Sequence, residues 1–156
     1  MNKSSLPTGQ KEALGALLED HRKVDKLFKD FEKAKSSEEK QRIAITVCNE
    51  LAVHAALEEE LFYPAVREIS PEKFGKLLDE ATVEHASAKD LIAQIAEMAP
   101  EDELFDAKVI VLGEYVRHHV KEEEEELFPK IIDEKCDLRP VAKQMEERRP
   151  ELSKAA

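Results

Sequence analysis

The sequence of 156 residues contains no tryptophan, only 4 glycines and only 2 cysteines. Scarce glycine beside abundant alanine, leucine, glutamate and lysine is typical of a mostly helical chain. Two cysteines cannot build a disulfide framework, so a reducing, cytoplasmic setting is the simplest interpretation. Cys48 lies among apolar residues and is expected to be a small core side chain, whereas Cys136 lies in a polar stretch.

Long apolar runs and a net positive charge are also lacking. No segment is long and apolar enough to span a bilayer, and the stretch MNKSSLPTGQKEALG contains no run that resembles a signal peptide. The net charge of -11 argues against nucleic acid, whose binding requires basic patches, and against anionic membrane surfaces. We therefore expect neither a nucleic-acid partner nor a membrane partner, and no protein partner is indicated.

Apolar residues recur at helical spacing along four long segments. The first helix is expected over about 10–34. Ser36 and Glu39 are spaced as a capping box that starts the second helix. Ser70 is placed to cap the third, with Pro71 at the first helical position. The stretch MAPED separates the third helix from the fourth.

Short connections between long amphipathic helices predict an all-α fold, an up-down-up-down four-helix bundle. We expect a single domain over 1–156 with its core in 10–135, and a short C-terminal extension with a helix over about 140–148. Proline inside a helix costs about 3 kcal/mol. The second and fourth helices are therefore expected to kink or end at Pro64 and Pro129.

The chain repeats itself. LAVHAALEEELFYPAV (51–66) aligns with YVRHHVKEEEEELFPKI (115–131) when Pro64 is set on Pro129, and DHRKVDKLF (20–28) aligns with EHASAKDLI (84–92). Each half thus supplies one lone histidine and one His-x-x-x-Glu pair. Residues four apart share a helix face, which places six polar residues on the apolar stripes. These residues are His21, His54, Glu58, His85, His119 and Glu123.

The neighbouring polar residues fall off these stripes. His118 is expected beside the stripe with Glu122 and Glu125, whereas Glu59, Glu60, Glu124 and Glu126 are expected outside it. Tyr115 and Glu50 lie one turn before the two repeat histidines. Two interpretations of each remain open: a ligand or a partner of a ligand, or an ordinary side chain at the edge of the stripe.

Two buried carboxylates need a partner or a metal ion, because burying an uncompensated charge is prohibitive. A single core histidine or a single His-x-x-x-Glu pair has an ordinary structural explanation, but the doubled set favours metal. Lys89 cannot compensate two glutamates and also explain four histidines. Imidazole and carboxylate ligands without thiolate suit iron, manganese or zinc better than copper(I) or calcium. Six ligands would leave open positions on two six-coordinate ions.

The segments EDHRKVDKLF, HAALEEELFYP, EHASAKDLI and HHVKEEEEELFP, spread over 19–129, resemble the bacterial branch of the hemerythrin-like, or HHE cation-binding, family. The resemblance implies a four-helix bundle that holds a non-haem di-iron centre, with two iron ions in preference to manganese or zinc. The implied ligands are His21, His54, Glu58, His85, His119 and Glu123, with Glu58 and Glu123 as bridging carboxylates.

The chain also departs from the invertebrate oxygen carriers of that family. Those carriers have two histidines one turn apart on the third helix, where this chain has Ala81 and Lys89 on either side of His85. They end in HxxxxD, where this chain has HxxxE. The resemblance therefore implies an extra open position on one iron. It favours reaction with peroxide or another small ligand over stable oxygen carriage.

The leading functional hypothesis is a cytoplasmic di-iron protein that binds or reacts with O2 or peroxide, in oxygen or oxidative sensing or in detoxification. Whether it turns over as an enzyme is left open. The alternatives are a module that buffers iron or another divalent metal, and a purely helical interaction domain. Two other site classes are disfavoured, because the Glu-x-x-His pairs of ferritin-like proteins and the HExxH of zinc proteases are both absent.

Overall fold

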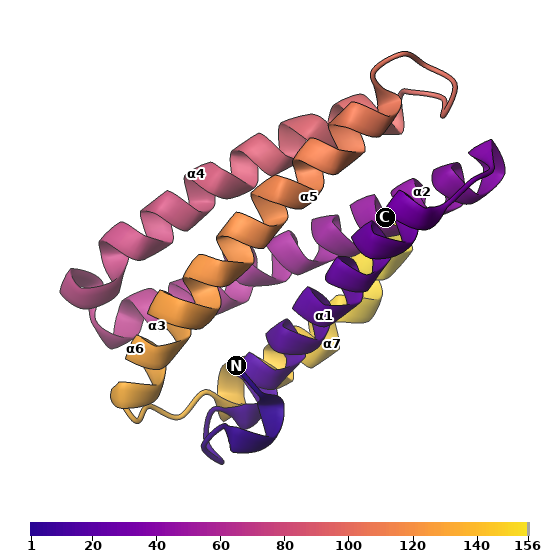
Figure 1. The fold of residues 1–156 in the computed structure, drawn as a ribbon. Coiled ribbons are helices and arrows are strands. Elements are labelled where there is room, and N and C mark those ends of the chain that lie inside the picture. The colour runs from indigo at the N-terminus through magenta and orange to yellow at the C-terminus, as the bar shows by residue number, and fades with distance from the viewer. Residues whose placement is uncertain (156) are drawn as a thin grey trace.

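The computed structural model describes residues 1–155, and every regular element among them is helical. Four long helices run alternately up and down, with α1 packed beside α2 and α4 packed beside α5 (Figure 1). Their bounds are Lys11–Lys33 for α1, Ser37–Leu57 for α2, Pro71–Ala96 for α4 and Phe105–Glu122 for α5. A short 3-10 turn, η1 (Lys3–Ser5), precedes them. The predicted four-helix bundle is confirmed.

The predicted helix starts are also confirmed. The Ser36 side chain accepts a hydrogen bond from the Glu39 backbone N–H at 3.2 Å, and Ser70 accepts one from the Lys73 N–H at 3.2 Å. Pro71 occupies the first position of α4, where a missing N–H costs nothing.

Two π-helical turns interrupt the long helices. α2 passes into η2 (Glu58–Phe62) and α3 (Tyr63–Ile69), and α5 passes into η3 (Glu123–Leu127) and α6 (Phe128–Asp133). In the first turn the Tyr63 N–H bonds to the carbonyl of Glu58, and in the second the Phe128 N–H bonds to the carbonyl of Glu123. Each turn therefore begins at a glutamate of a His-x-x-x-Glu pair.

The helices were expected to kink or end at Pro64 and Pro129. Neither helix ends there, because both continue through their proline, but a π turn interrupts the regular α-helix shortly before each one. A proline ring in an α-helix clashes with the carbonyl one turn earlier. Each π turn ends two residues before its proline and includes the residue four positions before it, so the wider turn can accommodate the ring. The extra residue also shifts the buried face, so that Phe62 and Tyr63 are buried while Leu61, four residues after the buried Leu57, is only half-buried.

The C-terminal helix is longer than the predicted 140–148. α7 spans Arg139–Ala155 and packs on α1 and α2, where it buries Val141 and Met145 (Figure 1). Pro150 lies inside this helix. Its last turns are held by two ion pairs, that of Arg148 with Glu60 of η2 and that of Arg149 with Asp20 of α1.

Apolar side chains form two clusters, one on each side of the histidines. One lies toward α3, α6 and α7 and includes Phe62, Phe74 and Phe128. The other lies toward the 97–104 loop and includes Phe28 and Phe105. Helix α4 contributes little to the second cluster, because His85 is its only buried residue between positions 82 and 94.

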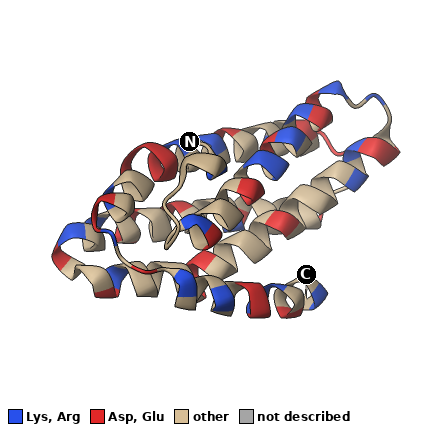
Figure 2. Cartoon of the chain, turned by 90° about the horizontal axis from the view of Figure 1, so that it is seen from below, with Lys and Arg blue, Asp and Glu red and all other residues tan. Residues whose placement is uncertain are grey.

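Acidic and basic side chains are interspersed along the helices (Figure 2). Within residues 1–155, none of the helices combines the length and the hydropathy that a bilayer crossing requires.

Candidate metal centre

The structure brings all six predicted site residues together in the middle of the bundle. They form two groups whose potential ligand atoms lie within 4.8 Å of one another: His21, His54 and Glu123 in the first, and Glu58, His85 and His119 in the second. Five of the six are buried, and the side chain of His119 is 12% exposed. Each of the four long helices supplies one histidine, as the sequence predicted, and each π turn supplies one glutamate.

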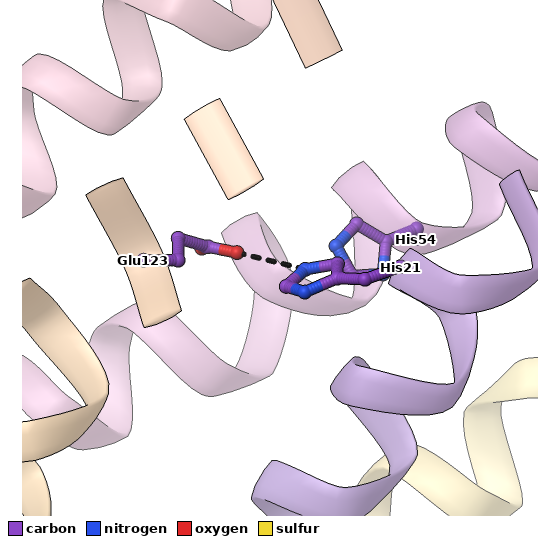
Figure 3. Close-up of side chains that lie close together, drawn as sticks. All are labelled: His21, His54 and Glu123. Atoms are coloured by element: carbon purple, nitrogen blue, oxygen red, sulfur yellow. Dashed lines mark hydrogen bonds and ion pairs between the residues drawn. The ribbon is translucent and has the colours of Figure 1, made fainter. Parts of the chain in front are cut away.

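The Nε2 atoms of the four histidines face the two glutamates. The distances are 3.1 Å from His21 to Glu123, 3.2 Å from His54 to Glu58, 3.1 Å from His85 to Glu58 and 3.4 Å from His119 to Glu123. Figure 3 shows Glu123 reaching toward the ring of His21, with the ring of His54 beside it. Each glutamate therefore contacts a histidine of both groups.

Three of these inward atoms have no hydrogen-bond partner. They are Nε2 of His54 and both carboxylate oxygens of Glu58, and all three are buried. Native proteins rarely leave buried polar atoms unsatisfied. Imidazole nitrogen and carboxylate oxygen are a donor set for iron, manganese or zinc. The residues present therefore fit a pair of divalent metal ions.

The Nδ1 atoms of the same histidines point outward, each to a carboxylate. The pairs are His21 with Glu124 at 2.8 Å, His54 with Asp20 at 2.9 Å, His85 with Glu59 at 3.0 Å and His119 with Glu84 at 3.0 Å. A carboxylate that accepts the Nδ1–H fixes the ring and leaves Nε2 free to bind a metal. All four rings have the orientation that a metal centre requires.

Each outer carboxylate is in turn held by a basic group. The pairs are Glu124 with Arg22 at 2.9 Å, Asp20 with Arg149 at 2.9 Å, Glu59 with Lys89 at 2.8 Å and Glu84 with His118 at 3.5 Å. Burial opposes ionisation of Glu124, but the bonds from His21 and Arg22 outweigh it and lower its pKa to about 2. Bonds from His54 and Arg149 likewise outweigh burial and lower the pKa of Asp20.

The four outer carboxylates were not predicted to act at the site, although Glu59 and Glu124 were expected outside the stripes. A signal for them exists in the repeat. An acidic residue precedes each lone histidine, as Asp20 and Glu84 do, and a second glutamate follows each His-x-x-x-Glu pair. These are the four positions whose side chains hold the Nδ1 atoms.

Tyr63 is a further residue of the centre that the sequence did not reveal. Its hydroxyl donates to Oε2 of Glu123 at 2.6 Å and lies 3.3 Å from Nε2 of His119 and 3.4 Å from Nε2 of His85. Burial, reinforced by Glu123 and Glu58, raises the pKa of this phenol, so it stays protonated. The repeat sets Tyr63 on Phe128, which has no hydroxyl, so the doubled pattern does not identify it.

Tyr115 and Glu50, whose roles were left open, lie away from the inward-facing atoms. The Tyr115 side chain is largely exposed, and Glu50 pairs with Lys23 at 2.7 Å. His118 is 66% exposed, in agreement with its predicted place beside the stripe.

Protons on the histidines offset the buried carboxylates of the metal-free protein. Burial disfavours the charged form of His54, but Glu58 and Asp20 outweigh burial and raise its pKa to about 10. Glu123 has the same effect on the pKa values of His21 and His119, which are also raised. A bound metal would replace these protons, because a ligand histidine must be neutral at its coordinating nitrogen.

A cleft of about 940 Å³ leads to this centre. It is bordered mainly by α2, α4 and α5, and it reaches all four histidines. Its remaining lining is mostly apolar and includes Leu51, Ile92 and Val116.

Comparison with known proteins agrees with this geometry. The family model described as hemerythrin HHE cation binding domain matches residues 13–131, which contain all six site residues. The chain belongs to this family. The crystal structure of a hemerythrin HHE cation binding domain-containing protein, the Rv2633c homologue from Mycobacterium kansasii, superposes with a TM-score of 0.76 at 22% identity. That match covers 92% of this chain and 88% of the other and confirms the hemerythrin-like fold.

A DNA nickase from Nostoc sp. is 32% identical to this hemerythrin HHE chain over 112 residues. The match covers 72% of this chain but only 31% of the nickase, so the chain spans less than a third of that protein's length. The similarity gives no support to the expectation, drawn from net charge, that nucleic acid is not a partner. That expectation stays a prediction.

Proposed function

We propose that this hemerythrin HHE chain is a non-haem di-iron protein that binds or reacts with O2 or peroxide, in oxygen or oxidative sensing or in detoxification. The observation that carries the proposal is the set of four inward Nε2 atoms around two buried carboxylates. Among these atoms, Nε2 of His54 and both carboxylate oxygens of Glu58 have no hydrogen-bond partner. The proposed ligands are His21, His54, Glu58, His85, His119 and Glu123.

Glu58 and Glu123 are suited to bridge two ions. Oε1 of Glu58 lies 3.2 Å from His54 of the first group and 3.1 Å from His85 of the second. Glu123 directs one oxygen to His21 of the first group and the other to His119 of the second. A carboxylate between two sets of histidines can bind one metal through each side.

Two bound ferrous ions would supply one electron each to O2 or peroxide. The chain contributes rigid imidazole ligands, because each ring is fixed at Nδ1 by a carboxylate. Tyr63 holds a proton 2.6 Å from Oε2 of Glu123, at the edge of the second group. The cleft, whose lining is mostly apolar, gives small neutral molecules a route to the histidines. The choice of iron over manganese or zinc rests on the family resemblance.

Nicking of DNA is not carried over from the Nostoc protein, because this chain spans only 31% of that protein.

The test is metal content joined to spectroscopy. Protein loaded anaerobically with Fe(II) is expected to hold two ions per chain and to develop a visible absorption band when O2 or peroxide is added. One ion per chain, or none at saturating iron, would overturn the paired site. Equal uptake of zinc or manganese with no spectral response to O2 would favour metal buffering.

A matched pair of variants tests which histidine belongs to the centre. His119→Ala is expected to abolish the band, because it removes an inward Nε2 atom. His118→Ala is the comparison, since this exposed residue lies next in sequence and supplies no inward nitrogen. It contacts Glu84 at 3.5 Å, so its loss is expected to weaken metal binding slightly but to leave the band in place. Equal loss in both variants would contradict the ligand assignment.

A further inference from the structure

The cleft above the metal centre is larger than O2 or peroxide needs. Its volume of about 940 Å³ falls at the upper end of the range found for pockets that hold drug-sized ligands, roughly 300–1,000 Å³. Protein interiors are normally packed to the density of organic crystals. An apolar cleft of this size beside buried polar groups therefore has the character of an organic ligand site.

The cleft exists because the side chains on its two walls are small. Ala52, Ala55 and Ala56 line it from α2, and Ala88 and Ala93 line it from α4. Alanine side chains are too short to meet across the space. The larger apolar residues of this part of α4, Leu91 and Ile92, are only half-buried.

The shape of the cleft is elongated along the helices. On α4 the lining runs from Glu84 and His85 at the metal centre to Ala93 toward the 97–104 loop. Eight residues of helix span roughly 12 Å at a rise of 1.5 Å per residue. An unbranched molecule could thus lie with one end at the histidines and its chain against Ile92 and Ala93.

The charges that line the cleft disfavour an anionic ligand. Four carboxylates line it, those of Asp20, Glu59, Glu60 and Glu84. Outside the metal-site histidines, its basic lining groups among the described residues are Lys89 and His118. Lys89 already pairs with Glu59 at 2.8 Å, and His118 pairs with Glu122 at 3.1 Å. In the metal-free protein a carboxylate headgroup would therefore face negative charge without a free cation, because the four histidines already contact Glu58 and Glu123.

We propose that this cleft binds an uncharged, unbranched apolar molecule of medium chain length, carrying at most a hydroxyl group, with one end at the metal centre. The inference rests on the proposed di-iron function only in stating that metal ions lie at one end of the cleft. It would make apolar organic molecules a candidate class of substrate for that centre. Binding itself depends only on the cleft, so it can be measured with and without metal.

The probe is decan-1-ol, titrated by calorimetry into the iron-loaded protein and into the metal-free protein. We expect saturable binding of one molecule of decan-1-ol per chain in both forms. In the metal-free protein, where no ion can bind a carboxylate, decanoate should bind at least about ten-fold more weakly because of the acidic lining. Ala88→Leu places a larger side chain in the cleft and is expected to weaken decan-1-ol binding by about ten-fold or more. Ala86→Leu is the control, because Ala86 is exposed on the same helix and does not line the cleft.

A second variant on the facing wall, Ala55→Leu, guards against a folding defect in Ala88→Leu, and the melting temperature of each variant is recorded. Absence of saturable binding to the wild type would overturn the proposal, and so would equal losses in Ala86→Leu and Ala88→Leu. Decanoate binding to the metal-free protein as tightly as decan-1-ol would overturn the uncharged class. A wild-type dimer that Ala88→Leu dissociates, with no decan-1-ol binding, would assign the cleft to a second copy of the chain instead.

The two proposals fail in different ways. Two iron ions per chain without decan-1-ol binding would refute the ligand site alone. Binding of decan-1-ol to a protein that never takes up two ions would refute the di-iron function and leave the ligand site standing.

Discussion

The C-terminal helix reaches the metal centre through a single side chain, and Arg149→Ala tests that connection. The guanidinium of Arg149 donates two hydrogen bonds to Asp20, at 3.1 and 2.9 Å, and Asp20 accepts from Nδ1 of His54 at 2.9 Å. The substitution leaves Asp20 with His54 as its remaining side-chain partner and lets the pKa of Asp20 return toward its ordinary value. We expect the orientation of His54 to become less well defined.

The magnitude follows from the two bonds and their exposure. A hydrogen bond to a charged group contributes about 1.5–3 kcal/mol when it is well shielded. The Arg149 side chain is 33% exposed, so solvent screening reduces its contribution to the stability of the metal-free fold to about 1 kcal/mol. Changes in the partners that orient metal ligands typically lower metal affinity 10–100-fold. Since Arg149 acts through Asp20, the metal affinity is expected to fall about ten-fold, or about 1.4 kcal/mol, for the ion bound by His54.

The assay is release of the two ions to a competing chelator. The ion held by the group of His21, His54 and Glu123 should leave about ten times faster in Arg149→Ala, whereas the ion held with His85 and His119 should be much less affected. The rings of the second group are fixed by Glu59 and Glu84, which Arg149 does not touch, so the change reaches the second ion only through the shared carboxylates.

Arg148→Ala is the matched control. Arg148 is the preceding residue of α7 and is similarly exposed, but it pairs with Glu60 and Glu151, neither of which bonds a histidine. It should leave both release phases unchanged. The reasoning is refuted if the two variants behave alike, or if Arg149→Ala accelerates both phases equally.

Four further outcomes are expected. Chelation should lower the melting temperature of the wild type, because it removes up to about 4 kcal/mol of binding free energy at a thousand-fold excess of metal over Kd. In Glu58→Gln the melting temperature should no longer respond to chelator. Glu125→Gln, at an exposed position, is the control, and an equal fall in the melting temperature of both variants on chelation would count against Glu58 as a ligand. Tyr63→Phe should lower the stability of the metal-free protein in urea by about 1–2 kcal/mol, because it leaves Oε2 of Glu123 without its donor. It should still load two ions, and loss of one would instead make the phenol a ligand. The pKa of His54, raised from 6.5 to about 10, contributes stability that is complete below pH 6.5 and is lost as the pH rises toward 10. Urea unfolding of the metal-free protein should therefore show lower stability at about pH 9 than at about pH 6, and a flat or rising profile would contradict the raised pKa.

Local spacing along the sequence was sufficient to predict the helices and the faces that they turn inward. Ser36 and Ser70 start their helices where the capping patterns placed them, because a cap depends on residues only three positions apart. His119 and Glu123 face inward together because residues four apart share a helix face, whatever the rest of the fold does. The doubling of that pattern was enough to predict which six polar residues meet.

The groups that hold those six residues in place depend on how the helices pack. Glu124 reaches His21 from another helix, and Arg149 reaches Asp20 from α7, so neither pair can be read from spacing along one segment. Tyr63 enters the centre because a π turn adds one residue to the helix before it, and 3.6-residue periodicity cannot anticipate that shift. Local periodicity assigns a side chain to a face of its helix, but its partner depends on how separate helices pack in three dimensions.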